Sequence, residues 1–335
     1  MTDVIDIHFH MVPLPFLEAL RAGELRPAVE VETRRDRDDL VFHAPPDIVV
    51  EPEISVRPHQ YDERTLLAAL DARRLDAAAV SPPPELLLYW ASPELGERIA
   101  HIMNDGMAQF ARAHPDRFLP LATLPMQDPH RALRELERAI TDLGLRGIVL
   151  CTHVCGRDLD DTRYEPIFAA ASRLQAPVLL HPQNAGDISR IKDFHLWNVI
   201  GFPVETTIAA TRLIVSGLFE RYPALSVVLA HAGGHLAYQF GRLDHAYRAQ
   251  PAAFAGLPKP PSAYLGNIYC DSLTHDAKAL RFLIDRAGAD HVVLGTDYPF
   301  AMQCKTPVEA VEALSLPPTQ HTAVLGGTLS RLLHL

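Results

Sequence analysis

Eight short apolar runs alternate with segments of helical periodicity, and this alternation constrains the fold more than any other feature of the sequence. Several of the runs are apolar throughout, which is typical of parallel strands covered on both faces. We expect strands at 4–10, 76–81, 118–124, 147–152, 177–181, 225–231, 267–271 and 291–297. Helices are expected between them, among others at 93–113, 164–174, 204–218, 236–248, 276–287 and 307–314. The pattern predicts an α/β fold of the (β/α)8 TIM-barrel class.

An open, doubly wound sheet is the competing architecture. Such sheets often carry a glycine-rich phosphate loop after a strand, and neither G-x-G-x-x-G nor G-x-x-x-x-G-K-[ST] occurs here. We therefore expect a single barrel domain over residues 1–335. Residues 11–60 are broken repeatedly by prolines and are expected to form an irregular insertion that covers one mouth of the barrel, with 29–33 and 39–43 paired as a hairpin.

Composition narrows the class of partner. The formal net charge is −10, from 31 basic and 41 acidic side chains, and basic residues cluster only in the mixed run at 34–39. This balance argues against nucleic acid and anionic membranes as partners. The first residues carry no positive segment, and no apolar stretch approaches the roughly 18 residues needed to span a bilayer. The four cysteines form no C-x-x-C pair, so we expect free thiols in a cytoplasmic protein.

Histidine and aspartate side chains stand where the apolar runs end. His8 and His10 lie two residues apart and so project from one face of a strand. His181, His231 and Asp297 each end a later run. Any one of them alone could be a hydrogen-bonded core residue, but a parallel barrel brings the carboxyl ends of all its strands to one rim. Imidazole and carboxylate groups gathered there predict a metal site.

The residues at these strand ends match a known superfamily. Its motifs read here as Ile-Asp-Ile-His-Phe-His at 5–10, Leu-His-Pro at 180–182, Ala-His-Ala-Gly-Gly at 230–234 and Gly-Thr-Asp-Tyr-Pro-Phe at 295–300. Further matching stretches lie at 203–206, 216–223, 241–244 and 260–262. Together they resemble the amidohydrolase superfamily, specifically the decarboxylase branch typified by aminocarboxymuconate semialdehyde decarboxylase. The resemblance covers nearly the whole chain.

The resemblance implies that His8, His10, His181 and Asp297 hold one divalent metal ion, with zinc expected and manganese as the alternative, and that no organic cofactor is needed. A water molecule would complete the site, and His231 would act beside it, together with Asp297, as the catalytic acid–base. Many superfamily members hold a second metal through a carboxylated lysine at the end of the fourth strand. The corresponding residues 149–153 contain no lysine, so one metal is expected.

Substrate recognition is also implied by the resemblance. Arg57 and Arg242 match arginines that hold substrate carboxylates, and guanidinium suits that task because it offers a planar fork of donors. Arg242 would reach into a neighbouring subunit, which implies a homodimer. Phe300 and Trp197 would flank the substrate, with plain core packing as the alternative for both. His153 either supports the metal site or is merely buried.

The expected activity is metal-dependent, non-oxidative decarboxylation of an unsaturated or aromatic carboxylic acid, with His231 handling the proton. One alternative keeps the site but makes it a hydrolase or hydratase of a lactone, amide or enol acid, because fold does not fix reaction. Another is a structural metal site in a binding protein, although such sites are usually closed and rich in thiolates. The segment 183–186 and the insertion depart from the type member, so the sequence leaves the substrate open.

Overall fold

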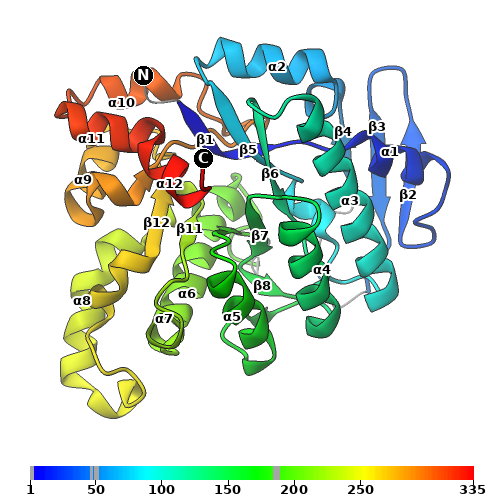
Figure 1. Ribbon diagram of the computed structural model, residues 1–335. Coiled ribbons are helices and arrows are strands. Elements are labelled where there is room, and N and C mark those ends of the chain that lie inside the picture. The colour runs from blue at the N-terminus through cyan, green and yellow to red at the C-terminus, as the bar shows by residue number, and fades with distance from the viewer. Residues whose placement is uncertain (1–3, 46–47, 49–52, 184–188) are drawn as a thin grey trace.

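A computed structural model describes residues 4–45, 48, 53–183 and 189–335. Its centre is an eight-stranded parallel sheet rolled into a barrel and surrounded by helices (Figure 1). The strands follow one another around the barrel in chain order as β1 (Ile5–His10), β5 (Ala77–Ser81), β6 (Phe118–Ala122), β7 (Gly147–Cys151), β10 (Val178–His181), β11 (Val227–Leu229), β12 (Ile268–Asp271) and β13 (Val292–Val293). The predicted (β/α)8 fold is therefore confirmed.

The barrel is closed by single backbone hydrogen bonds rather than by a regular ladder. The amide of Ile7 donates to the carbonyl of Leu294 at 2.9 Å, and the amide of Asp297 donates to the carbonyl of His8 at 2.7 Å. Next along the chain, the amide of His10 donates to the carbonyl of Tyr298 at 2.8 Å. These bonds bring the segment after β13 against β1, so the two ends of the chain's strand series meet at the site described below.

Helices form the outer layer of the barrel. The principal ones are α2 (Glu63–Ala72), α3 (Pro93–Ala113), α4 (Pro129–Thr141), α5 (Glu165–Arg173), α6 (Phe202–Val215), α7 (Leu218–Arg221), α8 (Leu236–Ala249), α9 (Ala277–Ala287), α10 (Pro307–Glu312), α11 (Pro318–Thr322) and α12 (Thr328–Leu332). The helix expected at 93–113 has the predicted bounds. The helix expected at 204–218 is wrong at its end, because Gly217 takes a left-handed conformation with φ +74° and separates α6 from α7.

Three predicted strands are too long by two residues or more, among them the run at 118–124, which forms a strand only over β6. The run at 225–231 forms a strand only over β11, and the run at 291–297 only over β13. His231 and Asp297 have φ values of +53° and +60°, a left-handed conformation that cannot continue a strand, so neither strand can include the last residue predicted for it. The backbone turns sharply where the candidate functional side chains stand.

The insertion after β1 is more regular than expected. It contains the helix α1 (Leu14–Arg21) and an antiparallel sheet of β2 (Val29–Thr33), β3 (Asp38–Phe42) and β4 (Glu53–Val56). The predicted hairpin is confirmed, since β2 pairs with β3. Phe16 and Leu40 pack in a second apolar cluster with Ile99 and Met103 of α3. That the insertion covers a barrel mouth, and that 1–335 is one domain, stay predictions.

Apolar packing dominates the barrel wall. Every residue of β1, β5, β6, β7, β10 and β11 is buried, as expected for strands covered on both faces. Within the described part of the chain, no helix has both the length and the apolar character needed to cross a membrane.

Candidate active site

Four side chains from distant parts of the chain converge at the carboxyl rim of the barrel. His8 and His10 come from β1, His181 ends β10, and Asp297 follows β13. Each offers one ligand atom, and these four atoms all lie within 4.8 Å of one another. All four side chains are buried. The structure thus brings together the complete set of metal ligands expected from the sequence.

The donor atoms fit a divalent metal ion. The Nε2 atoms of His8 and His10 lie 3.1 Å apart, and Asp297 Oδ1 lies 3.2 Å from the first and 3.4 Å from the second. His181 Nε2 is buried and has no hydrogen-bond partner within the described residues. A cation coordinated by all four atoms would give these buried polar atoms a partner, and buried polar atoms are costly to leave unpaired. Three imidazoles and a carboxylate, without thiolate, are typical of catalytic rather than structural sites.

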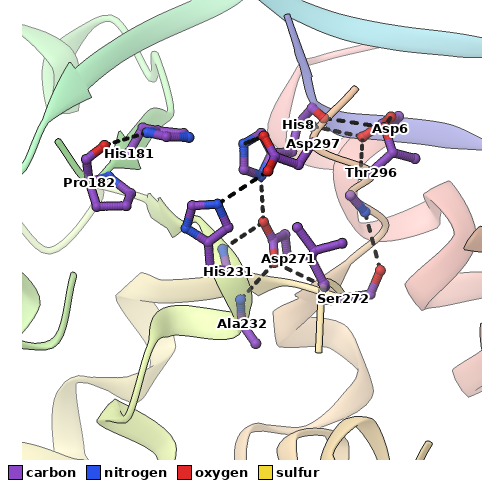
Figure 2. A network of polar contacts seen from close by, with 12 residues as sticks. Asp6, His8, His181, Pro182, His231, Ala232, Asp271, Ser272, Thr296 and Asp297 are labelled. Atoms are coloured by element: carbon purple, nitrogen blue, oxygen red, sulfur yellow. Dashed lines mark hydrogen bonds and ion pairs between the residues drawn. The ribbon is translucent and has the colours of Figure 1, made fainter. Parts of the chain in front are cut away.

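Hydrogen bonds on the far side of each ring orient the three histidines. The Nδ1 atom of His8 lies 2.7 Å from Asp271 Oδ2, and that of His181 lies 2.6 Å from the carbonyl oxygen of Pro182 (Figure 2). His10 Nδ1 lies 3.3 Å from the carbonyl oxygen of Pro82. When Nδ1–H donates to these acceptors, the Nε2 lone pair of each ring faces the common centre, as metal-binding histidines require.

Burial and neighbouring charges shift the pKa values of His8, His181 and Asp297 away from their usual values. Burial lowers the pKa of His181 well below its usual value, and the neighbouring His8 adds to this effect. Burial opposes a charge on His8 as well, but Asp297 and Asp271 outweigh it and raise the pKa of His8 to about 10. Burial also opposes ionisation of Asp297, yet His8 holds the pKa of that carboxyl well below its usual range. A cation bound here would compete with a proton for the ring nitrogen of His8.

His231 lies beside the four ligands. Its Nε2 is 3.6 Å from Asp297 Oδ2, and its ring centroid is 5.1 Å from that of His181. The ring of Phe202, at the start of α6, stacks on it at 6.0 Å with an interplanar angle of 12°. His231 Nδ1 has no hydrogen-bond partner among the described residues. This position is suited to proton exchange with a group bound at the metal centre.

The backbone around His231 is strained. His231 and Ala232 have φ values of +53° and +56°, and the left-handed region costs a non-glycine residue roughly 1–2 kcal/mol. Gly233 and Gly234 also have positive φ, of +70° and +61°, which glycine adopts without that cost. A Cβ at Gly234 would lie 2.1 Å from the carbonyl oxygen of Pro203, so the Gly-Gly pair also lets α6 approach. This turn directs the His231 side chain inward.

Two buried carboxylates that the sequence analysis did not name hold the rim together. Asp6 Oδ1 accepts the amides of His8 at 2.8 Å and Thr296 at 3.1 Å (Figure 2). Burial raises the pKa of Asp6 to about 7, while its hydrogen bond from Thr296 acts in the opposite direction. Asp271, at the end of β12, bonds to His8 and to the amides of His231 and Ala232. For Asp271 the available signal was an acidic residue at the end of an apolar run, as at 297, whereas Asp6 lies inside such a run.

The four expected substrate residues divide into two pairs. Phe300 contacts the ligand group, with its ring centroid 5.2 Å from that of His10, and Trp197 packs edge-on against Phe202 at 5.3 Å. Arg57 instead pairs with Asp36 of the insertion at 3.3 Å and is 43% exposed. Arg242 is exposed on α8 and has no polar partner among the described residues. Neither arginine contacts the candidate metal centre in this single chain.

A cavity of about 490 Å³ opens next to the centre. His231 and Asp297 line its inner end. Its walls include the apolar or aromatic side chains of Phe202, Leu273, Met302, Tyr238 and Phe282. Apolar walls around a few convergent polar groups are typical of small-molecule sites.

His153 lies one layer away from the ligands. Its Nδ1 accepts the amide of Gly156 at 3.1 Å, and Gln183, which follows His181 and Pro182, donates to its carbonyl oxygen at 2.8 Å. Its side chain is 14% exposed. The remaining residues of the departing segment, 184–186, lie outside the described part of the chain.

Comparisons with known proteins agree with this geometry. The amidohydrolase family model matches residues 5–335. The chain is 35% identical over 277 residues to the 2-amino-3-carboxymuconate-6-semialdehyde decarboxylase of Dictyostelium discoideum, an alignment that covers 82% of this chain and 77% of the relative.

Solved structures show the same likeness. The 5-carboxyvanillate decarboxylase of Sphingomonas paucimobilis superposes with a TM-score of 0.83 at 28% identity, covering 100% of both chains. The dihydroxybenzoic acid decarboxylase of Polaromonas sp. JS666, solved with manganese and 2-nitroresorcinol, has a TM-score of 0.77 at 25% identity and covers 100% of this chain and 98% of its own. The chain therefore belongs to the amidohydrolase family, in the branch that contains these decarboxylases.

Proposed function

We propose that this protein is a metal-dependent, non-oxidative decarboxylase of an unsaturated or aromatic carboxylic acid. The observation that carries the proposal is the convergence of His8, His10, His181 and Asp297 with His231 beside them. The decarboxylases named above act, by their names, on a carboxymuconate, a carboxyvanillate and a dihydroxybenzoate. A hydrolase or hydratase reading of the same site finds no comparable support among these relatives.

The reaction replaces a carbon–carboxylate bond with a carbon–hydrogen bond and consumes one proton for each CO2 released. His231 is the group placed to deliver that proton to the carbon that bears the carboxylate, since its Nε2 borders both the ligand group and the cavity. The electron pair of the broken carbon–carbon bond then restores the conjugated system of the product. A divalent cation, when bound, supplies positive charge that polarises substrate oxygens and lowers the pKa of water.

The aromatic side chains are suited to position a flat substrate. Phe300 lies against His10, Phe202 stacks on His231, and Trp197 packs edge-on against Phe202. Planar rings bind conjugated acids by offset stacking and edge contacts. We therefore assign Phe300 and Trp197 to the walls of the substrate site.

The expected role of Arg242 in binding substrate requires a second copy of the chain. Arg242 is exposed on α8, where a guanidinium can reach a carboxylate bound in a neighbouring subunit. Arg57 would have to leave Asp36 to bind substrate. A homodimer in which Arg242 completes the partner's site is thus part of the proposal.

We also propose a cytoplasmic location, as expected from the sequence.

Zinc is the metal we propose, because three imidazoles and one carboxylate suit it, with manganese as the alternative. The manganese in the Polaromonas relative supports that alternative. Equilibrium dialysis of the purified protein against each metal, followed by turnover assays, separates the two.

The test measures CO2 release from 2,6-dihydroxybenzoate, 5-carboxyvanillate and 2-amino-3-carboxymuconate-6-semialdehyde by protein loaded with zinc or manganese. Two variants serve as matched controls: His181→Asn should lose both metal and turnover, whereas His231→Asn should keep the metal and lose turnover. Products that have gained water without evolving CO2 would contradict the proposal, and so would an unchanged rate in His231→Asn.

A further inference from the structure

Asp271 sits between the candidate metal centre and the candidate acid–base residue, with contacts to both. It ends β12 and is completely buried. Its Oδ2 lies 2.7 Å from His8 Nδ1 and accepts the amide of His231 at 2.9 Å (Figure 2). Its Oδ1 accepts the amides of Ala232 at 2.7 Å and Leu273 at 3.0 Å.

Four donors around one carboxylate use its full capacity as an acceptor. The strand β11 ends at Leu229, so the backbone amides of His231 and Ala232 lie beyond its regular ladder of hydrogen bonds. The carboxylate is instead the acceptor for two consecutive amides that the left-handed turn directs toward it. Gly295 makes room for it, since a Cβ there would lie 2.7 Å from the Cβ of Asp271.

We propose that Asp271 is a positioning residue that fixes the His8 ring in its Nδ1–H form and, with the same carboxylate, holds the His231–Ala232 turn against the metal centre. The inference rests on the proposed metal site but adds a physical link that the proposed function does not require. Because His8 and His231 both bond to the Asp271 carboxylate, the orientation of the His8 ring and the orientation of His231 are coupled.

Asparagine at this position tests the link, because it preserves size and removes the charge. One amide oxygen can accept two of the four donors, while the new NH2 group faces the others as a donor. If that NH2 faces His8, the ring must present Nδ1 as the acceptor, which places Nε2–H toward the other ligands and blocks cation binding. The loss of a carboxylate behind a metal-binding histidine typically costs about 10–100-fold in metal affinity.

The experiment compares wild type, Asp271→Asn and the matched control Asp276→Asn. Asp276 follows the loop after β12 and caps α9 by accepting the amide of Ala279 at 2.8 Å, a role that asparagine fills equally well. Zinc affinity is measured by competition with a chromophoric chelator. Hydrogen exchange is followed on the peptide that contains the amides of residues 231 and 232.

We expect at least about a 10-fold loss of zinc affinity and faster exchange at these amides in Asp271→Asn, with neither change in Asp276→Asn. Zinc affinity within twofold of wild type, or unchanged exchange, would overturn the inference. Both readouts are independent of turnover, so a failure of decarboxylation alone leaves them interpretable and counts only against the proposed function.

Wild-type protein provides a measurement that does not depend on the variant folding. Nitrogen-15 correlation spectra of the zinc-loaded protein, with His8 assigned from its absence in His8→Gln, report which ring nitrogen carries the proton. We expect the proton on Nδ1 of His8. A proton on Nε2, or a His8 ring that does not bind zinc, would refute the role of Asp271.

Discussion

We expect Glu205 to lower the free energy of unfolding as pH rises, and its replacement by glutamine to abolish that contribution. The residue lies in the first turn of α6, and its side chain is only 15% exposed, with Oε2 3.9 Å from His153 Nε2. Burial, together with the neighbouring Asp158, raises the pKa of Glu205 from 4.5 to about 7. Because the folded value lies above the unfolded one, the native state takes up a proton that the unfolded chain does not hold between these pH values.

The sign and size of the effect follow from that interval. Stability contributed by Glu205 is fully present below pH 4.5, falls as pH rises to about 7, and is constant above it. The full interval corresponds to about 3 kcal/mol, and partial access of water to the carboxyl reduces the expected effect to about 1–2 kcal/mol. Glu205→Gln cannot ionise and should therefore gain about 1–2 kcal/mol over wild type between pH 5 and pH 8.

Urea unfolding of both proteins at pH 5, 6, 7 and 8, at constant metal and salt, provides the measurement. The metal ligands titrate equally in the two proteins, so the difference in unfolding free energy isolates Glu205. Glu220→Gln is the control, because Lys259 holds the pKa of Glu220 below its usual value and its removal should give no such gain. A free-energy difference between Glu205→Gln and wild type that does not change with pH would refute the reasoning.

Three further substitutions test other parts of the structure. Asp297→Asn should weaken zinc binding by more than about 100-fold in a chelator competition, since a ligand matters more than its supporting residues. Gly295→Ala places a Cβ 2.7 Å from that of Asp271, so we expect a loss of about 1–3 kcal/mol in urea unfolding together with weaker zinc binding. Glu135→Ala removes a carboxylate that is 1% exposed and that accepts hydrogen bonds from Asn104 and Arg138, which should cost about 2–3 kcal/mol in thermal unfolding. Unchanged values in any of these three assays would contradict the contact that it tests.

The barrel could be predicted because its signal repeats. Each buried strand is a short apolar run, and each covering helix carries apolar residues at spacings of three and four, so an error in one element leaves the fold class intact. The ends of the strands could not be predicted in the same way. Hydrophobic patterns report burial, and Leu294, Thr296 and Asp297 after β13 remain buried although the regular strand has ended and Asp297 has turned into the left-handed region.

The convergence of His8, His10, His181 and Asp297 could be predicted from the sequence because they stand at or near the ends of apolar runs, and parallel strands end at one rim. The arginines differ, since Arg57 and Arg242 owe their expected roles to resemblance alone. Their surroundings in the single chain, an ion pair with Asp36 and an exposed helix face, depend on loop paths and subunit contacts that no local pattern encodes.

Asp6 and Asp271 show why the geometry of this site exceeds what strand pairing provides. Regular pairing stops at Val293 in β13 and at Leu229 in β11, so the ladder itself does not position Asp297 or His231. Beyond the ends of these ladders, buried carboxylates provide the hydrogen bonds. Asp6 accepts the amides of His8 and of Thr296, which precedes Asp297. Asp271 bonds to the His8 ring and accepts the amides of His231 and Ala232. His8 bonds to both carboxylates, so His8, Asp297 and His231 are held relative to one another by hydrogen bonds to Asp6 and Asp271, which have no access to water. Such bonds are stronger than those between neutral groups and leave little freedom for rearrangement. A site preorganised in this way needs little movement to receive a cation, which is the property that electrostatic catalysis requires.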